Sequence, residues 1–229
     1  MQGHKSKRIV FVGSDTKLLK EWAKENETEV VSSLSFLFSM GTRFMPDLIV
    51  FLKVKDAELR ELRKNEAFKK TVVLIVQENF KDENNFNSIS DFPRVLICNE
   101  ELALEKSFYD SLMEIIEGKK KMLPVKTASI VKYTILFINK NYSKKLTRKN
   151  LADQVGVTDD YLSRVFNQEM GIPLWSYLNL LRLNAARELL EQTGISVKQV
   201  SSQCGFESSS YFTNCFTKKY GMSPSQVRE

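Results

Sequence analysis

The chain has 229 residues, of which 42% are hydrophobic and 27% are charged, a composition typical of a globular protein. This length is sufficient for two modest domains, each with a hydrophobic core of its own. No stretch approaches the roughly 18 uninterrupted apolar residues of a membrane span. The polar start, Met1–Arg8, lacks the apolar segment of a secretory signal. The sequence therefore predicts neither a membrane partner nor secretion.

Cysteine and histidine are too scarce for a metal site or a disulfide framework. The three cysteines, Cys98, Cys204 and Cys215, form no CxxC pair, and His4 is the only histidine. A structural zinc ion therefore lacks ligands, and the cysteine pattern favours a reducing, cytoplasmic location. We expect no cofactor and no metal, and we interpret Cys204 and Cys215 as small core residues.

Catalysis is not expected either. A catalytic triad or a Cys–His pair needs a histidine, and the single histidine lies in the polar start. The turn after the first predicted strand, Gly13–Thr16, lacks the GxGxxG pattern of dinucleotide-binding proteins. The sequence therefore indicates a protein that is not an enzyme.

Charge is distributed unevenly between the two halves of the chain. Residues 1–118 hold 17 Lys and Arg against 20 Asp and Glu, a net charge of −3. Residues 119–229 hold 17 against 8, a net charge of +9. Such asymmetry favours a nucleic-acid-facing half that is joined to a half with another role.

The first half alternates short apolar runs with helical segments. Near-continuous apolar strands separated by helices indicate a parallel sheet covered on both faces, so we predict a five-stranded doubly wound α/β domain. The predicted strands are Arg8–Gly13, Thr28–Ser32, Asp47–Leu52, Thr71–Val76 and Arg94–Cys98. The predicted helices are Lys17–Asn26, Leu34–Gly41, Ala57–Asn65 and Leu102–Glu117, with a weak, polar segment at Asp82–Ser90.

A linker is predicted at residues 119–126, between a domain of residues 1–118 and a domain of residues 127–229. Gly118 ends the preceding helix, three lysines keep the segment solvated, and Pro124 stops a helix from continuing.

The rest of the chain is predicted to be all-helical. An amphipathic helix at Ser129–Asn141 is followed by a helix that Thr147 caps. Gly156 then makes a tight turn, and Thr158 caps the next helix, Asp159–Met170. Two helices joined by a glycine-centred turn are typical of a helix-turn-helix unit.

The same pattern recurs near the end of the chain. Val197–Phe206 predicts a helix and turn with Gly205 in the turn, and Glu207–Tyr220 predicts the second helix of the unit. One helix of 20 residues, Leu174–Thr193, is predicted between the two units. It would span roughly 30 Å, close to the roughly 34 Å between successive major grooves on one face of DNA.

Residues 127–229 resemble the DNA-binding domain of the AraC/XylS family. Two packing positions depart from the family pattern, because Ser201 replaces the usual alanine and Val227 replaces the usual aromatic residue. The residues that carry the resemblance are Tyr161–Phe166, Gly171, Arg182, Ala186, Leu189, Leu190, Ile195, Val197, Val200, Gly205, Phe206, Ser210–Phe212, Phe216, Lys218, Lys219, Gly221, Ser223, Pro224 and Arg228.

The resemblance implies a set of DNA contacts. Arg164 could pair with guanine and Asn214 with adenine, whereas Arg182 and Arg187 are expected to fix their helix against its neighbours. The implied base contacts are Asp160, Ser163, Arg164 and Asn167 in the first unit, and Ser209, Ser210, Thr213 and Asn214 in the second. The implied phosphate contacts are Lys144, Lys145, Arg148, Lys218 and Lys219.

The N-terminal half resembles a response-regulator receiver domain in its strand–helix order and in the strings Ile9–Val12 and Pro46–Phe51. The residues that a receiver uses for phosphorylation are missing, and Asp47 lies too early in its strand to replace them. The degenerate positions are Gly13 and Ser14 for the acidic pair, Leu52 for the phosphoacceptor, Val76 for the hydroxyl and Cys98 for the lysine. We therefore expect a pseudo-receiver that is not phosphorylated on aspartate.

The leading hypothesis is a cytoplasmic, sequence-specific transcription regulator of the response-regulator type that binds double-stranded DNA. The resemblance also points to a homodimer formed through the N-terminal domain and to RNA polymerase as a partner, with Leu102–Glu117 as the candidate protein-binding surface. Two alternatives remain open: an α/β domain that senses a small molecule, or a C-terminal fragment of a larger sensor-regulator. Neither the operator nor the input signal follows from the sequence.

Overall fold

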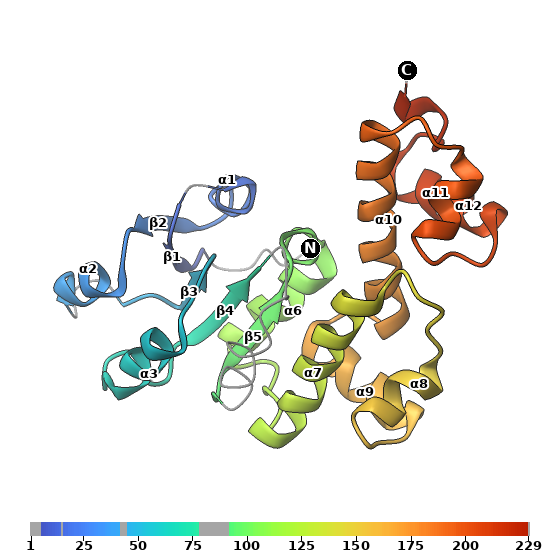
Figure 1. Ribbon diagram of the computed structural model, residues 1–229. Helices are drawn as coiled ribbons and strands as arrows, with labels where there is room; N and C mark the ends of the chain where they lie inside the picture. The colour runs from blue at the N-terminus through green and yellow to red at the C-terminus, as the bar shows by residue number, and fades with distance from the viewer. Residues whose placement is uncertain (1–5, 15, 42–44, 78–91, 229) are drawn as a thin grey trace.

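The N-terminal half folds around a five-stranded parallel sheet, as predicted (Figure 1). The computed structural model describes residues 6–14, 16–41, 45–77 and 92–228. The strand order β2-β1-β3-β4-β5 is the flavodoxin-like order of doubly wound sheets. The strands are β1 (Arg8–Val12), β2 (Glu27–Val31), β3 (Leu48–Phe51), β4 (Val72–Val76) and β5 (Val95–Cys98).

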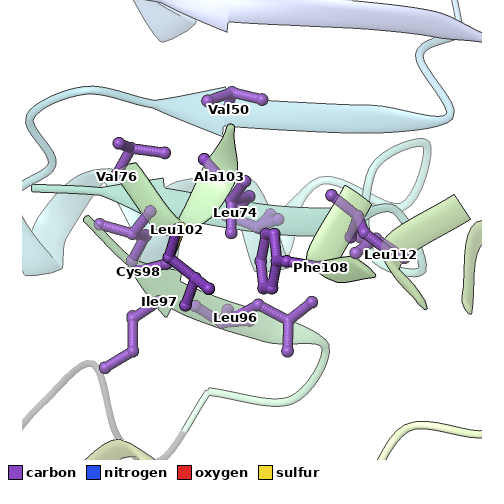
Figure 2. Packing of buried hydrophobic residues seen from close by; sticks show 14 of the residues in the cluster. Val50, Leu74, Val76, Leu96, Ile97, Cys98, Leu102, Ala103, Phe108 and Leu112 are labelled. Atoms are coloured by element: carbon purple, nitrogen blue, oxygen red, sulfur yellow. The ribbon is translucent and has the colours of Figure 1, made fainter. Parts of the chain in front are cut away.

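The three strands β3, β4 and β5 are buried along their whole length, which explains why their sequences do not alternate between apolar and polar residues. Figure 2 shows Leu74 of β4 and Leu96 of β5 packed with Leu102, Phe108 and Leu112 from the helices that follow the sheet. Apolar contact on both faces therefore holds the sheet and fixes the positions of its strand ends.

The helices of this half lie where they were predicted, but two predicted helices differ from the structure in extent. The first ends at Trp22 rather than Asn26. Instead of one helix at Leu102–Glu117, the chain forms two, because the Asn99 side chain caps a short helix by accepting the Leu102 N–H at 3.1 Å. This helix ends at Ala103, and the next one begins at Lys106. The predicted segment Asp82–Ser90 lies outside the described residues. The helices are α1 (Lys17–Trp22), α2 (Leu34–Ser39), α3 (Asp56–Lys64), α5 (Glu100–Ala103) and α6 (Lys106–Ile116).

The C-terminal half is all-helical in the described residues, as predicted. The first helix begins at Val125 rather than Ser129, directly after Pro124, whose fixed backbone angle suits the start of a helix. The helices are α7 (Val125–Asn141), α8 (Arg148–Gln154), α9 (Asp159–Met170), α10 (Leu174–Gln192), α11 (Val197–Gln203) and α12 (Ser209–Tyr220), followed by the short 3₁₀ helix η2 (Gln226–Arg228).

The hydrophobic core is divided differently from the expectation of one core for each half. The first core runs from Ile9 in β1 to Leu180 in α10, so it joins the sheet to α7, α8, α9 and the start of α10. The reason is that α7 packs against β5 and α10 packs against α5. A separate second core lies under α11 and α12, along the end of α10. Figure 1 shows these two helices beside α10, away from the sheet. The second core consists of Leu183, Ala186, Leu190, Val200, Cys204, Phe206, Phe212 and Phe216.

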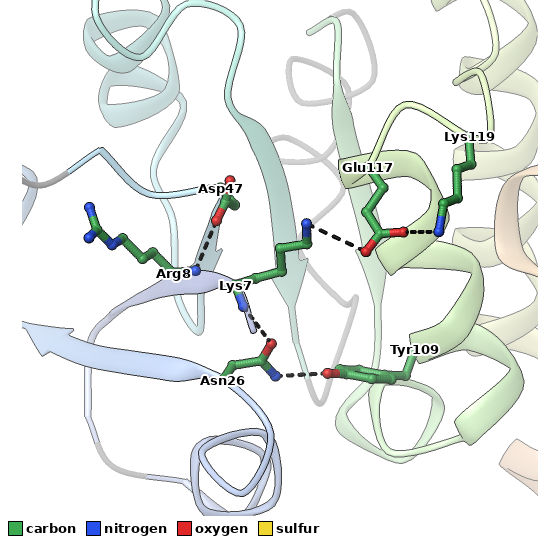
Figure 3. A network of polar contacts seen from close by, with 7 residues as sticks. All are labelled: Lys7, Arg8, Asn26, Asp47, Tyr109, Glu117 and Lys119. Carbon is green, nitrogen blue, oxygen red and sulfur yellow. Dashed lines mark hydrogen bonds and ion pairs between the residues drawn. The ribbon is translucent and has the colours of Figure 1, made fainter. Parts of the chain in front are cut away.

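Polar contacts tie the first strand to α6 and to the start of the linker (Figure 3). The Lys7 N–H donates to the Asn26 side chain at 3.2 Å, and that side chain donates to the Tyr109 hydroxyl at 2.7 Å. The Lys7 ammonium pairs with Glu117 at 3.5 Å, and Glu117 also pairs with Lys119 at 2.6 Å. The linker is therefore held against the sheet domain where it leaves α6.

In the described part of the chain, no helix combines the length and the apolar character needed to cross a membrane.

Candidate nucleic-acid interface

The first helix-turn-helix unit consists of α8 and α9. Thr147 and Thr158 cap the two helices, as predicted, by accepting backbone N–H groups at 3.1 and 3.3 Å. Gly156 in the turn (φ 68°) and Gly171 after α9 (φ 70°) adopt left-handed backbone angles that disfavour other residues. Local chemistry alone therefore sets where both helices of this unit begin and end.

The outward face of α9 carries three of the four predicted base contacts. Asp160, Arg164 and Asn167 are exposed, whereas Ser163 is half-buried. The Arg164 guanidinium lies 5.2 Å from the centre of the Tyr161 ring, so its position is partly supported by a cation–π contact. Leu162, Val165 and Phe166 are buried on the opposite face.

The second unit consists of α11 and α12. Its second helix begins at Ser209 rather than Glu207, because the Ser208 hydroxyl caps it by accepting the Tyr211 N–H at 3.2 Å. Gly205 in the turn (φ 82°) and Gly221 after α12 (φ 73°) again take left-handed backbone angles. The two units are therefore built by the same devices.

On α12, Ser210 and Asn214 are exposed, whereas Ser209 and Thr213 are half-buried. The Thr213 hydroxyl donates to the Ser209 carbonyl at 2.9 Å, so this side chain is engaged with its own helix. The open face of α12 is thus centred on Asn214.

Sequence reasoning missed several polar side chains on the two open faces. Gln168 on α9 and Thr217 on α12 are exposed beside the predicted contacts, and the helical period alone could have found them. Tyr211 is 49% exposed, and its hydroxyl accepts a hydrogen bond from Asn179 of α10 at 3.0 Å. Tyr211 thus contributes an aromatic surface that is anchored to α10.

The predicted phosphate contacts fall into two groups. Arg148 and Lys218 are exposed on the surface. Lys144, Lys145 and Lys219 are engaged within the chain, by the Asn141 side chain at 2.8 Å, Glu207 at 3.1 Å and Glu105 at 2.6 Å, respectively.

The two arginines of α10 interact within the chain, as predicted. Arg182 is only 7% exposed and donates to backbone carbonyls of Tyr142 and Lys144. Arg187 pairs with Glu191 at 2.8 Å and lies 5.1 Å from the centre of the Tyr220 ring. Both side chains therefore fix α10 against itself or its neighbours.

A buried carboxyl group lies behind the open face of α9. Glu169 is 3% exposed, and its Oε2 accepts the Leu123 N–H of the linker at 3.4 Å, while its Oε1 has no hydrogen-bond partner among the described residues. Burial raises the pKa of Glu169, and the nearby ammonium groups of Lys132 and Lys120 partly oppose that rise. The Lys120 ammonium donates to the Ser111 hydroxyl of α6. Glu169 therefore connects α9 to the linker, and Lys120 connects the linker to α6.

The degenerate receiver positions meet at the carboxyl ends of the strands. Gly13 and Ser14 are exposed after β1, and a Cβ added to Gly13 would lie 3.5 Å from Leu52, which follows β3. Val76 and Cys98, at the ends of β4 and β5, are buried, and burial raises the pKa of the Cys98 thiol. These five positions therefore provide neither a carboxylate nor an ammonium group at this edge.

Three further carboxylate residues are relevant to this edge of the sheet. Asp47 lies at the opposite end of β3, where it accepts the Arg8 N–H at 2.9 Å, whereas Asp15 lies outside the described residues. Sequence reasoning missed Glu100, which accepts the Leu18 N–H in the first turn of α1 at 3.1 Å. Among the residues that the structure describes, no three His, Cys, Asp or Glu side chains gather as they would around a metal ion.

Comparison with known proteins agrees with the geometry of the C-terminal half. Residues 151–229 match the model of a protein family described as a helix-turn-helix domain. The uncharacterized HTH-type transcriptional regulator YfiF of Bacillus subtilis is 28% identical over 141 residues, which cover 61% of this chain and 45% of that protein. The HTH-type transcriptional activator RhaS of Escherichia coli is 28% identical over 156 residues, which cover 68% of this chain and 52% of that protein.

Among solved structures, the C-terminal domain of the two-component response regulator yesN from Fusobacterium nucleatum is similar to part of this chain. It is 31% identical and matches with a TM-score of 0.42, covering 43% of this chain and 96% of that one.

The sequence matches support an AraC-type helix-turn-helix domain at the C-terminal end of the chain. The chain spans about half the length of the two curated relatives described above, 45% and 52%.

Proposed function

We propose that this protein is a sequence-specific DNA-binding transcription regulator whose two helix-turn-helix units read neighbouring segments of the major groove. The observation that carries the proposal is the pair of open polar faces on α9 and α12, attached to one continuous helix, α10. At about 1.5 Å per residue, the 19 residues of α10 span roughly 28 Å, which approaches the separation of adjacent major grooves. The net charge of +9 on residues 119–229 supports attraction to phosphate.

Within this proposal, Arg164 and Asn214 carry most of the base discrimination. Arginine can donate two hydrogen bonds to guanine, and asparagine can pair in a bidentate manner with adenine. The remaining base-contact candidates, Asp160, Ser163, Asn167, Ser209, Ser210 and Thr213, refine the preference, and Arg148 and Lys218 add affinity without sequence information.

Selection of random duplex DNA by the purified chain tests this function. We expect an enriched motif with two parts separated by about one helical turn. Arg164→Ala and Asn214→Ala should each relax the base preference in a different part of the motif and cost about 1–3 kcal/mol of binding free energy. Lys218→Ala should weaken binding to all sequences alike. If no motif is enriched, the proposal fails.

We further propose that the N-terminal half is a pseudo-receiver, residues 1–118, that is not phosphorylated on aspartate and that supports a homodimer. The flavodoxin-like strand order and the lack of a carboxylate at Leu52 support this assignment. Mass spectrometry after incubation with acetyl phosphate and Mg²⁺ should detect no aspartyl phosphate, and light scattering should report a dimer. Modification of Asp15 or Asp47 would overturn the expectation that no aspartate is phosphorylated. A monomer at micromolar concentration would overturn the proposed homodimer.

A further inference from the structure

The long helix α10 passes from one hydrophobic core to the other. Leu180 belongs to the first core and Leu183 to the second. Arg182 lies between them and is itself buried. At this point apolar packing no longer connects the two helix-turn-helix units, so their mutual orientation depends on one continuous helix and on polar contacts, among them the buried ones around Arg182.

Arg182 holds the loop that leads from α7 into α8. Its Nε donates to the Tyr142 carbonyl at 2.8 Å, and its Nη2 donates to the Lys144 carbonyl at 3.0 Å. Tyr142 and Leu146 in this loop pack against the first core. Because the donor is charged and buried, these bonds are stronger than neutral ones. Arg182 thus attaches the middle of α10 to the first unit.

The turn of the second unit rests on the same loop. A Cβ added to Gly205 would lie 2.7 Å from the Tyr142 carbonyl oxygen and 2.8 Å from that of Ser143, a separation too short for any other residue without movement of the backbone. The next residue, Phe206, belongs to the second core, and its ring centre lies 5.7 Å from the Arg182 guanidinium. The loop is therefore held between α10 and the second unit.

An ion pair joins the same two parts at the surface, where Lys145 of the loop lies 3.1 Å from Glu207, just after the turn. The corresponding turn of the first unit makes no such approach, because a Cβ added to Gly156 would meet nothing within 4 Å. The close packing at Gly205 therefore reflects its contact with the loop and is not a general requirement of the turn.

We propose that the clamp formed by Arg182, the loop Tyr142–Lys145 and Gly205 sets the distance between the two recognition helices, α9 and α12, and thereby the spacing of the DNA half-sites that the protein accepts. This inference rests on the proposed DNA-binding function. Arg182 acts as a positioning residue that does not touch DNA. Without the clamp, the second unit is held only by α10 and by two exposed contacts of α12, Tyr211 with Asn179 and Lys219 with Glu105. Exposed polar contacts contribute little, so the second unit can shift relative to the first and accept several spacings. Part of the binding free energy would then be lost to ordering the units.

The test uses the full chain and the duplex obtained by selection, together with duplexes in which the two half-sites are moved apart or together by one to five base pairs. For the wild-type chain we expect affinity to fall sharply when the spacing changes. Arg182→Lys keeps the charge but lacks the planar guanidinium, whose two separate nitrogens reach the two carbonyls. For this variant we expect about tenfold weaker binding to the full site and a flattened dependence of affinity on spacing. Affinity for each isolated half-site should remain within about twofold of the wild type.

A matched pair of glycine variants separates the clamp from the turn itself. Gly205→Ala should flatten the spacing dependence as Arg182→Lys does, whereas Gly156→Ala carries the same left-handed penalty without the clash and should keep the wild-type dependence. Thermal melts establish that each variant is folded. If the two clamp variants do not fold, the surface variant Glu207→Gln tests the clamp instead. We then expect a smaller flattening of the dependence of affinity on half-site spacing.

Three outcomes would overturn the inference. The first is folded clamp variants with an unchanged spacing preference, and the second is a folded Arg182→Lys that loses affinity for isolated half-sites. The third is a spacing dependence that Gly156→Ala flattens as much as Gly205→Ala does. The proposed function fails differently, because the wild-type chain would then prefer no duplex over random DNA.

Discussion

The two helix-turn-helix units are nearly equivalent in local structure and very different in what supports them. The helices α9 and α12 each have 12 residues, each is capped by a hydroxyl, and each ends at a left-handed glycine, Gly171 or Gly221. The first unit shares its core with the sheet domain, whereas the second has a small core of its own. Similar local sequences therefore produced one unit that shares the core of the sheet domain and one that packs around a separate core.

The same position of the two helices carries residues of opposite charge type, and each makes a contact outside its own helix-turn-helix unit. Two residues before the final glycine, α9 carries Glu169, which bonds the linker, and α12 carries Lys219, which pairs with Glu105. Residues 147–171 hold 3 basic and 4 acidic side chains, whereas residues 196–221 hold 3 basic and 1 acidic. If the proposed DNA-binding function holds, we expect the second unit to contribute more of the attraction to phosphate than the first.

The largest expected effect comes from the glycines that end α9 and α12. A Cβ at Gly171 would lie 2.5 Å from the Ser111 Cβ and 2.9 Å from the Ser107 carbonyl oxygen, whereas one at Gly221 would meet nothing within 4 Å. Gly221→Ala should cost about 1–2 kcal/mol for its left-handed backbone, and Gly171→Ala about 3 kcal/mol or more because the clash is added. Urea denaturation measures both.

Partial recovery by Ser111→Gly in the Gly171→Ala background would identify the contact with α6 as the cause. Equal losses for the two glycine variants would contradict the view that only the first unit is built into the sheet domain.

Thiol labelling compares the two cores directly. Cys98 is buried in the first core and Cys204 in the second, and burial raises the pKa of Cys204 to about 11, so both thiols should react only when their core opens. In a Cys215→Ser background, which removes the half-buried third thiol, we expect Cys204 to react at least about tenfold faster than Cys98 under native conditions. Equal rates would mean that the two cores open together.

A pH-dependent effect is expected at Glu169. Its pKa is raised in the folded chain, so the folded state keeps a proton that the unfolded state has already released. The free energy of unfolding should therefore fall as pH rises from the ordinary value of 4.5 to the raised value, and then level off. Glu169→Gln should remove this fall, so the variant gains stability relative to wild type across that window.

Urea denaturation between pH 4 and pH 8 measures the difference, with the exposed Glu61→Gln on α3 as the control. A constant difference between Glu169→Gln and wild type at every pH would show that the carboxyl does not titrate differently in the two states.

The smallest effect is expected at the ion pair between Glu105 and Lys219. The side chains are 38% and 25% exposed, so the pair contributes little to stability, and a DNA phosphate can compete for the lysine. Glu105→Gln should raise affinity for duplex DNA about two- to fivefold at low salt, with the gain shrinking between about 50 and 200 mM salt. Fluorescence anisotropy measures the effect, and Glu114→Gln, an exposed change of equal charge on α6, is the control. An identical gain in both variants would attribute the effect to net charge alone.

Much of the fold was predictable because its signals are local. The bounds of α9 and the caps Thr147 and Thr158 agree with the prediction, since a hydroxyl cap and a terminal glycine act within one helical turn. The prediction was wrong where a competing cap lay nearby, as at Asn99 before α5 and at Ser208 before α12. For the candidate interface, Arg164 and Asn214 are exposed as expected, but the half-burial of Ser163, Ser209 and Thr213 depends on their surroundings and could not be predicted.

By itself, the sequence determined the five strands, the two helix-turn-helix units and the basic character of the C-terminal half, because periodicity, capping and charge are properties of neighbouring residues. Only the tertiary structure decided that the first unit shares a core with the sheet, that Arg182 lies at the boundary between two cores, and that Lys219 faces Glu105. These features bring together residues that are far apart along the chain. Their contacts depend on how helices dock, which no local pattern specifies.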